Sequence, residues 1–375
     1  MPWQERSVMS ERQEFVTFAS QEGANVRSLC EHFGISRKTG YKWLARAAAG
    51  DLLLADHSRR PQTSPSQTAP AMVAQILELR AAHPSWGGRK LHHRLLAQGY
   101  AAVPVPSTIT AILRRHALLT PVAPPRGFIR FEHPAPNDLW QMDFMGHRAL
   151  VTGRVHPLTL LDDHSRFALL VAACANEQQA TVIAHLTTCF HRYGLPTAIL
   201  TDNGSPWATA GMGGISALEA WLLRLGVAVK HGQIAHPQTQ GKVERFHGTI
   251  AAEVFAHRQF TDLHQAQTRF AAFRTCYNLE RPHEALDYAV PASRYQPSVR
   301  SFPERVPPVT YGPDDLVCPV TAHGSIRWQG RRHFVSRGLV GEPVAIRPTR
   351  ETKVWAVVYC HRQVATIGLT TPDEV

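Results

Sequence analysis

The sequence contains few cysteines and no long apolar run. Its six cysteines stand singly, without a C-x-x-C pair, and its 21 histidines lack the paired cysteines of a zinc finger. No stretch approaches the roughly 18 consecutive apolar residues of a membrane-spanning helix, and the first residues do not have the layout of a signal peptide. These absences argue against a disulfide-rich secreted protein, structural zinc and a membrane role, and they predict a cytoplasmic protein with reduced thiols.

What the sequence has in excess is basic charge, and that charge is unevenly distributed. The formal net charge is +11 over 375 residues, of which +9 falls in residues 1–130, 0 in residues 131–300 and +2 in residues 301–375. A chain of this length exceeds one hydrophobic core, so we expect two to four domains. The basic N-terminal third predicts a nucleic-acid contact, although a solvated basic surface is the alternative.

Residues 1–50 have the pattern of a helix-turn-helix domain. We expect a helix over residues 11–22, a second over 26–33 with Asn25 as its N-cap, and a third that Ser36 caps. A recognition helix in the major groove carries exposed basic and polar residues. The residues of the third helix predicted to contact DNA are Arg37, Lys38, Tyr41, Lys42 and Arg46. A three-helix bundle without DNA binding remains the alternative.

Residues 70–120 predict a second helix-turn-helix domain between two linkers. Its expected helices cover residues 71–82, begin again near Arg89 and Lys90, and end with a helix that Ser107 caps and that reaches residue 118. Arg89 and Lys90 are candidate DNA contacts. Residues 51–69 are rich in Ser, Thr, Gln and Pro and residues 121–136 are rich in Pro, which is typical of linkers.

The central region, residues 137–300, alternates predicted strands and helices. Strands are expected at residues 139–145, 157–162, 167–172, 197–200 and 227–229, and helices at residues 177–193, 215–225 and 239–256. This order predicts an α/β core, a sheet with helices on both faces.

Three acidic residues stand out within this region. Asp143 lies in an aromatic strand-like run, Asp202 follows a buried-type strand, and Glu244 lies on the last predicted helix. A lone acidic residue is usually a solvated surface group. Three carboxylates converging from separate elements, however, would suit magnesium, a hard cation that takes oxygen ligands and leaves positions open for phosphate oxygens.

The helix that carries Glu244 has a clear apolar stripe. Val243, Phe246, Ile250 and Val254 recur at helical spacing, which places Glu244 at the edge of the buried face. The cations Lys242 and Arg245 flank Glu244 in the sequence. We interpret them as candidate phosphate contacts, with a solvated face as the alternative.

Five motifs together resemble one family. They are WQMDF (140–144), DDHSRF (162–167), TDNG (201–204), HPQTQGKVERFH (236–247) and YNLERPH (277–283). Residues 137–300 resemble the integrase core of DDE transposases, in the retroviral integrase superfamily with its ribonuclease-H-like fold. The N-terminal units resemble those of single-frame bacterial insertion-sequence transposases.

The resemblance implies a function and a set of site residues. Asp143, Asp202 and Glu244 would be the catalytic, metal-binding triad, holding two Mg²⁺ ions for which Mn²⁺ can substitute. The protein would bind terminal inverted repeats, cut the element end and join its 3′-hydroxyl to target DNA. Two ends must meet, which implies at least a homodimer, and the location implied is the bacterial cytoplasm in association with the nucleoid.

Two features complicate this picture. Between Asp202 and Glu244 lie 41 residues, against about 35 in many such relatives, and a loop insertion near Gly211 costs little because loop-closure entropy grows only logarithmically with length. Asp162 and Asp163 are rival metal ligands, although Asp is also common before a turn for backbone reasons. Asn203 and Gly204 suggest a tight turn that fixes the direction of Asp202.

Residues 301–375 change to short β-like runs, at residues 326–328, 332–335, 344–346 and 354–359, for which we expect a small SH3-like β-barrel. Two other functions remain open from the sequence. One is a noncatalytic DNA-binding regulator, against which the intact triad argues. The other is a ribonuclease-H-like nuclease, which would not need two sequence-reading domains.

Overall fold

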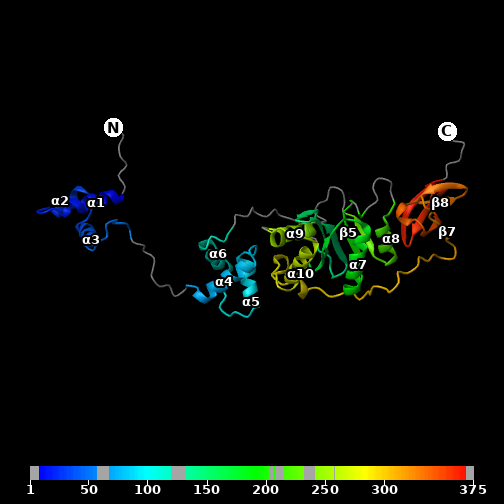
Figure 1. Cartoon of the computed structure of the whole chain (residues 1–375), viewed down its shortest axis with the longest axis horizontal. Helices are drawn as coiled ribbons and strands as arrows, with labels where there is room; N and C mark the ends of the chain where they lie inside the picture. Colours follow the sequence, from blue (N-terminus) through cyan, green and yellow to red (C-terminus); the bar gives the residue numbers. More distant parts are fainter. Residues whose placement is uncertain are drawn as a thin grey trace, which may run out of the picture. The chain divides into compact units, whose positions relative to one another are not determined.

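The structure is a computed structural model that describes residues 8–56, 67–119, 132–202, 204, 206–207, 214–231, 241–256 and 258–368. The chain divides into two compact units, residues 1–67 and residues 68–375, and each is described by itself (Figure 1). The predicted linkers at residues 51–69 and 121–136 fall partly outside the described residues.

The first unit consists of three helices, α1 (Val8–Ala19), α2 (Val26–His32) and α3 (Arg37–Ala48). The predicted N-caps are confirmed, since the side chains of Asn25 and Ser36 each accept a hydrogen bond of 3.2 Å from a backbone N–H in the first turn. Helices α2 and α3 approach closely at Gly40, where an added Cβ would lie 2.5 Å from Cys30 Sγ. These contacts make a small bundle of helix-turn-helix shape.

The second unit begins with another three helices, α4 (Pro70–Ala82), α5 (Gly88–Ala97) and α6 (Pro106–Arg115), around the buried Trp86. The predicted cap at Ser107 is wrong. Pro106 occupies the first helical position, where its fixed φ suits a helix start, and the N-cap is Val105 without a side-chain hydrogen bond.

The core of the second unit is a mixed six-stranded sheet. Its strands are β1 (Leu139–Phe144), β2 (Arg148–Leu150), β3 (Gly153–Asp162), β4 (Ala168–Cys174), β5 (Ala198–Thr201) and β6 (Ala228–His231). The order is β2-β3-β1-β5-β6, and β4 pairs with β3. Strand β3 is antiparallel to β1 and β4, whereas β5 is parallel to both β1 and β6.

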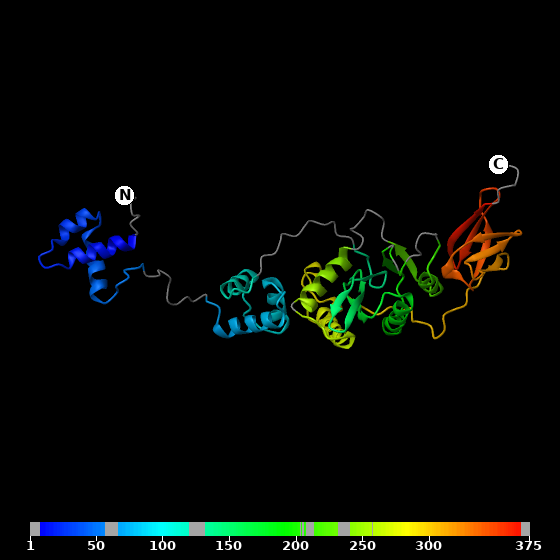
Figure 2. The same ribbon diagram turned by 45° about the horizontal axis from the view of Figure 1, so that its top comes forward.

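Helices cover both faces of this sheet, as predicted (Figure 2). Helices α7 (Gln179–Tyr193) and α8 (Ala217–Arg224) pack on one face around Trp140 and Phe190. On the other face lie α9 (Gly241–Ile250), the π-helical turn η2 (Ala251–Phe255) and α10 (Leu263–Leu279), packed around Phe246 and Phe270. Short 3₁₀ turns follow at η3 (Glu284–Leu286) and η4 (Pro291–Ser293). The prediction of an α/β core with helices on both faces of the sheet is therefore confirmed, although the short strand β2 was not predicted.

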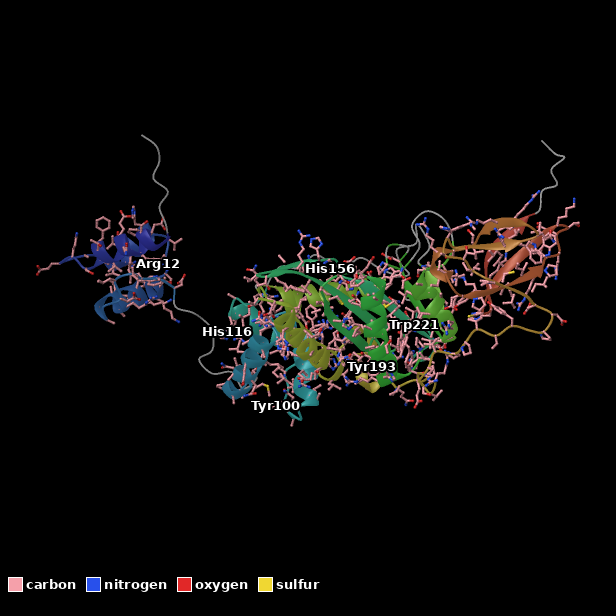
Figure 3. The ribbon with its side chains drawn as sticks, turned by 45° about the vertical axis from the view of Figure 1, so that its right-hand side comes forward. Arg12, Tyr100, His116, His156, Tyr193 and Trp221 are labelled. Carbon is pink, nitrogen blue, oxygen red and sulfur yellow. The ribbon has the colours of Figure 1, made fainter. Side chains whose placement is uncertain are left out.

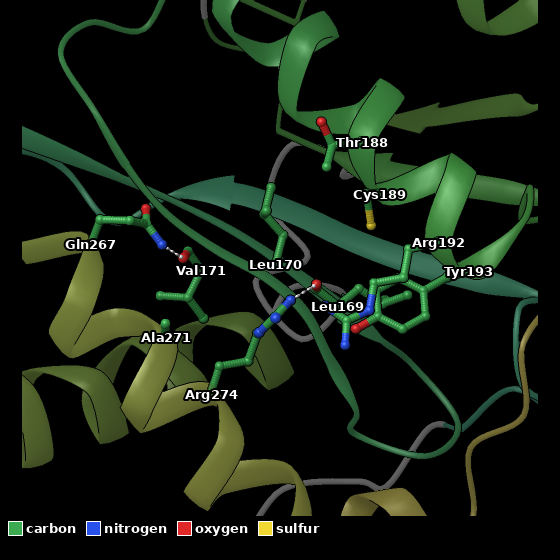
Figure 4. A pocket seen from close by; sticks show the side chains of 10 residues that line it. All are labelled: Leu169, Leu170, Val171, Thr188, Cys189, Arg192, Tyr193, Gln267, Ala271 and Arg274. Atoms are coloured by element: carbon green, nitrogen blue, oxygen red, sulfur yellow. Dashed lines mark hydrogen bonds between the residues drawn. The ribbon is translucent and has the colours of Figure 1, made fainter. Parts of the chain in front are cut away.

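Helix α10 was not expected from the sequence, and it protects the free edge of β4. Gln267 and Arg274 donate hydrogen bonds to the backbone carbonyls of Val171 and Leu169 (Figure 4). Asn278 exchanges two hydrogen bonds with the backbone of Ala168. An uncovered strand edge would present unpaired backbone groups for aggregation, so this row of polar side chains stabilises the end of the sheet.

The C-terminal strands are β7 (Leu316–Pro319), β8 (Ser325–Trp328), β9 (Arg331–Phe334), β10 (Pro343–Pro348), β11 (Val354–Tyr359) and β12 (Arg362–Gly368), with the 3₁₀ turn η5 (Arg337–Leu339). They form an open four-stranded sheet in the order β12-β11-β10-β7 and a separate β8-β9 pair. The predicted barrel is not confirmed, because neither sheet closes on itself within the residues that the structure covers.

The C-terminal sheet shares a hydrophobic cluster with α8. Ile215, Ala220 and Leu223 from the α8 segment pack with residues of β8, β10, β11 and β12. Ser336 Oγ donates a 2.6 Å hydrogen bond to the carbonyl oxygen of Ile215. A Cβ added at Gly338 would lie 2.2 Å from that same oxygen, so the two backbones are in close contact. Among the described helices, none is long and apolar enough to cross a membrane.

Candidate active site

Two of the predicted acids lie at the same end of neighbouring strands. Strands β1 and β5 are parallel, and Gln141 is in register with Leu200. Extending that register by two residues along each chain brings Asp143, in β1, beside Asp202, directly after β5. Side chains two residues apart in a strand share a face, so Gln141 and Asp143 also point the same way.

Glu244 lies in the first turn of α9. The predicted apolar stripe is confirmed: Val243, Phe246, Ile250 and Val254 are each no more than 2% exposed, whereas Glu244 is exposed. Burial of the stripe against the sheet thus fixes the rotation of α9 about its own axis and leaves Glu244 at the edge of the buried face.

Burial and the neighbouring acids raise the pKa of Asp143. Burial raises the pKa of Asp143 to about 7, with Asp202 as the next cause and smaller contributions from Glu244 and Glu177. Like charges that crowd a partly buried carboxyl favour its protonated form. A divalent cation among these oxygens would reverse that effect, and a donor set made only of carboxylates suits Mg²⁺ or Mn²⁺.

A histidine one turn after Glu244 joins α9 to the same strand. His247 Nε2 lies 2.8 Å from Thr159 Oγ1, and that hydroxyl donates to the backbone oxygen of Asp143 at 3.0 Å. His247 Nδ1 is 4.0 Å from an Asp143 carboxylate oxygen. Burial lowers the pKa of His247 to about 4, so the ring is neutral at pH 7. The neutral ring joins α9 to β3 through its hydrogen bond with Thr159.

Glu177 is a fourth acid near Asp143 that sequence reasoning missed. It lies between β4 and α7, and its Oε1 is 2.8 Å from Nδ1 of His156 on β3. Figure 3 labels His156. The sequence spacing between Asp143 and Glu177 gives no hint of their proximity, which arises from the pairing of β3 with both β1 and β4.

Asp202 is supported from two sides. Gly204 N donates a 2.9 Å hydrogen bond to Asp202 Oδ1, which fixes the carboxylate relative to the following turn. His231 Nδ1 lies 3.2 Å from the backbone oxygen of Asp202, and its Nε2 is 3.6 Å from the buried Glu219. Glu219 in turn pairs with Arg362 of β12. A chain of contacts therefore connects the C-terminal sheet to Asp202.

The rival acids Asp162 and Asp163 are fully buried, and their oxygens bond to the chain itself. Asp162 accepts from the backbone N–H of Asn137 and from both the N–H and the hydroxyl of Ser165. Asp163 accepts from Gln141 and from the backbone of His133 and pairs with Lys242. These contacts explain both aspartates as structural residues of the turn between β3 and β4.

Lys242 and Arg245, the two predicted phosphate contacts on α9, have different environments. The Lys242 ammonium lies 2.5 Å from Asp163 Oδ1, and its side chain is only 16% exposed. Burial, followed by nearby Arg166, lowers the pKa of Lys242 to about 8. Arg245 is exposed on the helix surface.

The residues of α3 predicted to contact DNA also divide into two groups. Arg37, Lys38, Tyr41 and Lys42 are exposed, and Tyr41 is 59% exposed. Arg46 is directed inward: its guanidinium pairs with Asp51, donates to the carbonyl of Ala55 and lies 4.7 Å from the centre of the Trp43 ring. Arg46 thus holds the chain after α3 against the bundle.

The two candidate contacts of the second helical unit lie against the core. Arg89 pairs with Glu284 of η3 at 2.6 Å, with both side chains about two-thirds exposed. Lys90 is half-buried, and burial, followed by Arg281, lowers its pKa to about 8. Further predictions, namely Asn203, the insertion near Gly211 and the segment at residues 236–240, lie outside the described residues.

Four kinds of family model match parts of the chain. Residues 133–237 and 225–291 match the family described as Integrase core domain. Residues 11–62 match a Helix-turn-helix domain and residues 39–113 a Homeodomain-like domain. Residues 315–374 match the C-terminal domain of the IS481 family transposases.

Two curated relatives are insertion-element proteins. The chain is 27% identical over 234 residues to the IS407 uncharacterized 31.7 kDa protein of Burkholderia multivorans, which is 61% of this chain and 82% of that one. It is 26% identical over 280 residues to the IS476 uncharacterized 39.2 kDa protein of Xanthomonas euvesicatoria, which is 71% of this chain and 74% of that one. Among solved structures, the simian T-cell lymphotropic virus intasome in complex with PP2A regulatory subunit B56 gamma aligns at 17% identity with a TM-score of 0.38, covering 77% of this chain and 99% of that chain.

Proposed function

Since the chain carries an integrase core domain together with the helix-turn-helix and C-terminal domains of insertion-element transposases, we propose that it is the transposase of an insertion sequence. In this proposal it binds the terminal inverted repeats of its element, cleaves the phosphodiester at the element end and joins the 3′-hydroxyl to target DNA. The observation that carries the proposal is the parallel pairing of β1 and β5, which brings Asp143 and Asp202 to the same end of neighbouring strands. The turn of α9 that contains Glu244 is bonded to the same strand β1 through Val243 and Gln141.

The residues of the chain would hold and orient the reacting groups. Asp143 in β1 and Asp202 directly after β5 would supply oxygens from neighbouring parallel strands, and Glu244 would supply its oxygens from the first turn of α9. Fixed donors of this kind lower the barrier because they need no rearrangement as charge develops on the phosphate. Thr159 donates to the backbone oxygen of Asp143, and the neutral His247 bonds to Thr159, so the two side chains hold the backbone at Asp143.

The three carboxylates would hold divalent metal, with two Mg²⁺ ions, or Mn²⁺ in their place, as the proposed occupants. Metal held there would supply positive charge to the attacking and leaving oxygens of an in-line displacement. Because two element ends must be joined in one event, we propose that the active form is at least a dimer bound to double-stranded DNA.

A joining assay tests this function. The element ends are defined by inverted repeats in the DNA that flanks the gene, and labelled duplexes carrying such an end are incubated with the full chain, a plasmid target and Mg²⁺ or Mn²⁺. We expect joined product with either ion and none with EDTA. Cleavage of an RNA–DNA hybrid without joining of repeat DNA would replace the proposal with a ribonuclease-H-like nuclease, and specific binding without either reaction would indicate a regulator.

The side chains of α3 provide a separate test of DNA reading. Lys38→Ala and Lys42→Ala are each expected to weaken repeat binding and to reduce the slope of log K against log salt by about 1, because each exposed ammonium would neutralise one phosphate. Fluorescence anisotropy over a salt series measures both quantities. Arg46→Ala is the contrasting variant: its main expected effect is a lower melting temperature of the first unit, since Arg46 binds Asp51. An unchanged salt slope in both lysine variants would remove α3 from the DNA interface.

A further inference from the structure

Gln141 bridges two segments that meet beside the three carboxylates. Its side chain is 2% exposed. Its Oε1 accepts a 3.3 Å hydrogen bond from the backbone N–H of Val243, and its Nε2 donates a 2.7 Å hydrogen bond to Asp163 Oδ1. Gln141 stands two residues before Asp143, and Val243 stands directly before Glu244. One amide side chain therefore connects the strand of one carboxylate to the helix of another.

The hydrogen bond from Val243 gives a partner to one backbone N–H group in the first turn of α9. The first N–H groups of an α-helix have no partner within the helix, and α9 begins at Gly241. Its third N–H finds an acceptor on β1, the side-chain oxygen of Gln141. The position of the first turn of α9 is thus set by the sheet, at the turn that contains Glu244.

Lys242 and Asp163 complete the connection. The Lys242 ammonium approaches Asp163 Oδ1 at 2.5 Å and also donates to the backbone oxygen of Asp163 at 3.2 Å. Asp163 is fully buried, and its backbone N–H bonds to the carbonyl of Leu139 at the start of β1. Lys242 is therefore attached to the turn between β3 and β4, which is itself attached to β1.

We propose that Gln141, Asp163 and Lys242 are positioning residues that fix Glu244 relative to Asp143, and that Lys242 acts inside the protein and not as a DNA contact. This inference rests on the proposed function, because it assigns the three residues to the same carboxylate site. On the far side of Glu244, the contact of His247 with Thr159 fixes the next turn of α9. The backbone of α9 is therefore fixed on both sides of Glu244, before it at Val243 and after it at His247.

The direct test measures the backbone of α9 without any reaction. In Gln141→Leu, hydrogen exchange at the Val243 amide is expected to quicken at least about tenfold, because the amide loses its acceptor while the leucine keeps most of the side-chain volume. Arg245→Met is the matched control, an exposed cation on the same helix, and is expected to leave this exchange rate unchanged. An unchanged rate in Gln141→Leu would overturn the positioning role of Gln141.

The second test separates positioning from DNA binding. In Lys242→Met, the Mn²⁺ concentration for half-maximal joining is expected to rise at least about tenfold, as is usual when groups that orient metal ligands are lost. The affinity for repeat DNA and its salt slope should remain unchanged, and Lys242→Arg should restore part of the Mn²⁺ dependence. A weaker DNA affinity with a salt slope smaller by about 1, and an unchanged Mn²⁺ dependence, would overturn the internal role of Lys242.

A third variant serves as the control for a loss of folding. Lys242→Met leaves the buried carboxylate of Asp163 unpaired, so Asp163→Asn with Lys242→Met removes both charges together. This double variant is expected to melt at a higher temperature than Lys242→Met and still to need more Mn²⁺ than the wild type. A normal Mn²⁺ requirement in the folded double variant would overturn the proposal. If the wild type joins no DNA, the proposed function fails, while the exchange rate of Val243 still decides whether the connection exists.

Discussion

Asp143→Asn, Asp202→Asn and Glu244→Gln are each expected to lower the yield of joined DNA at least about 1000-fold, or about 4 kcal/mol of transition-state stabilisation. The reason is that each change removes a charged oxygen donor from the same small site while keeping the size of the side chain. Binding of repeat DNA should persist, because the exposed cations of α3 lie in the other compact unit of the chain. A single-turnover joining assay together with anisotropy measures both quantities.

Glu177→Gln is the informative control for this series. Glu177 is also an acid near Asp143, but it is bonded to His156, and of the three neighbouring acids it raises the pKa of Asp143 the least. We expect a loss of about tenfold or less, in keeping with an indirect role. If Glu177→Gln abolished joining and Glu244→Gln did not, the third ligand would be Glu177 and the proposed triad would be wrong.

Without metal, the protein is expected to lose stability as pH rises from about 4 to about 7, and Asp143→Asn is expected to remove that loss. The pKa of Asp143 is raised to about 7 by burial and then by Asp202, from an ordinary value of 3.8. The folded chain therefore binds this proton more tightly than the unfolded chain, so ionisation in that window favours unfolding. At pH 8 in EDTA, Asp143→Asn should be more stable than the wild type by about 1 to 3 kcal/mol.

Calorimetric melting from pH 4 to pH 8 measures this difference. At pH 4 the two proteins should melt alike, because Asp143 is then protonated in the folded state. Addition of Mg²⁺ or Mn²⁺ at pH 8 should stabilise the wild type more than Asp143→Asn. Asp262→Asn serves as the control, since Asp262 is an exposed N-cap of α10 and asparagine caps equally well. A wild type that is more stable than Asp143→Asn at pH 8 in EDTA would contradict the crowding of carboxylates.

Much of the fold follows from local patterns. The stripe from Val243 to Val254 predicted which face of α9 is buried, and Asn25 and Ser36 predicted two helix starts. Helix α10 was missed although its signals are present: Asp262 caps its first turn, and Ala266, Phe270 and Tyr277 recur on one face. The apolar residues there are few and separated by polar ones, so the pattern is weak until the sheet that buries it is known.

The C-terminal region shows a different limit. Its strands were largely predicted from β-branched and aromatic runs, yet β7 and β12 were missed, and the barrel was not confirmed. Alternating side chains reveal a strand but not its partner. Closure of a sheet depends on which edges pair, and here the sheet instead shares its apolar face with α8.

In the candidate site too, some residues were identified from local sequence and others only from long-range packing. Asp143, Asp202 and Glu244 were proposed as ligands from their motifs alone, because residue type and neighbouring residues carry that information. The roles of Gln141, Lys242, Glu177 and His231 depend on contacts across 29 to 102 residues of sequence.

By itself, the sequence determined most of the helices and strands, the basic N-terminal third and the choice of the three acids as candidate ligands, since these depend on residue type and short-range spacing. Only the tertiary structure decided that Lys242 and Arg46 face inward, that Asp162 and Asp163 are engaged by the chain, and that a fourth acid lies beside Asp143. The physical reason is that the environment of a charged side chain depends on which distant segments pack around it.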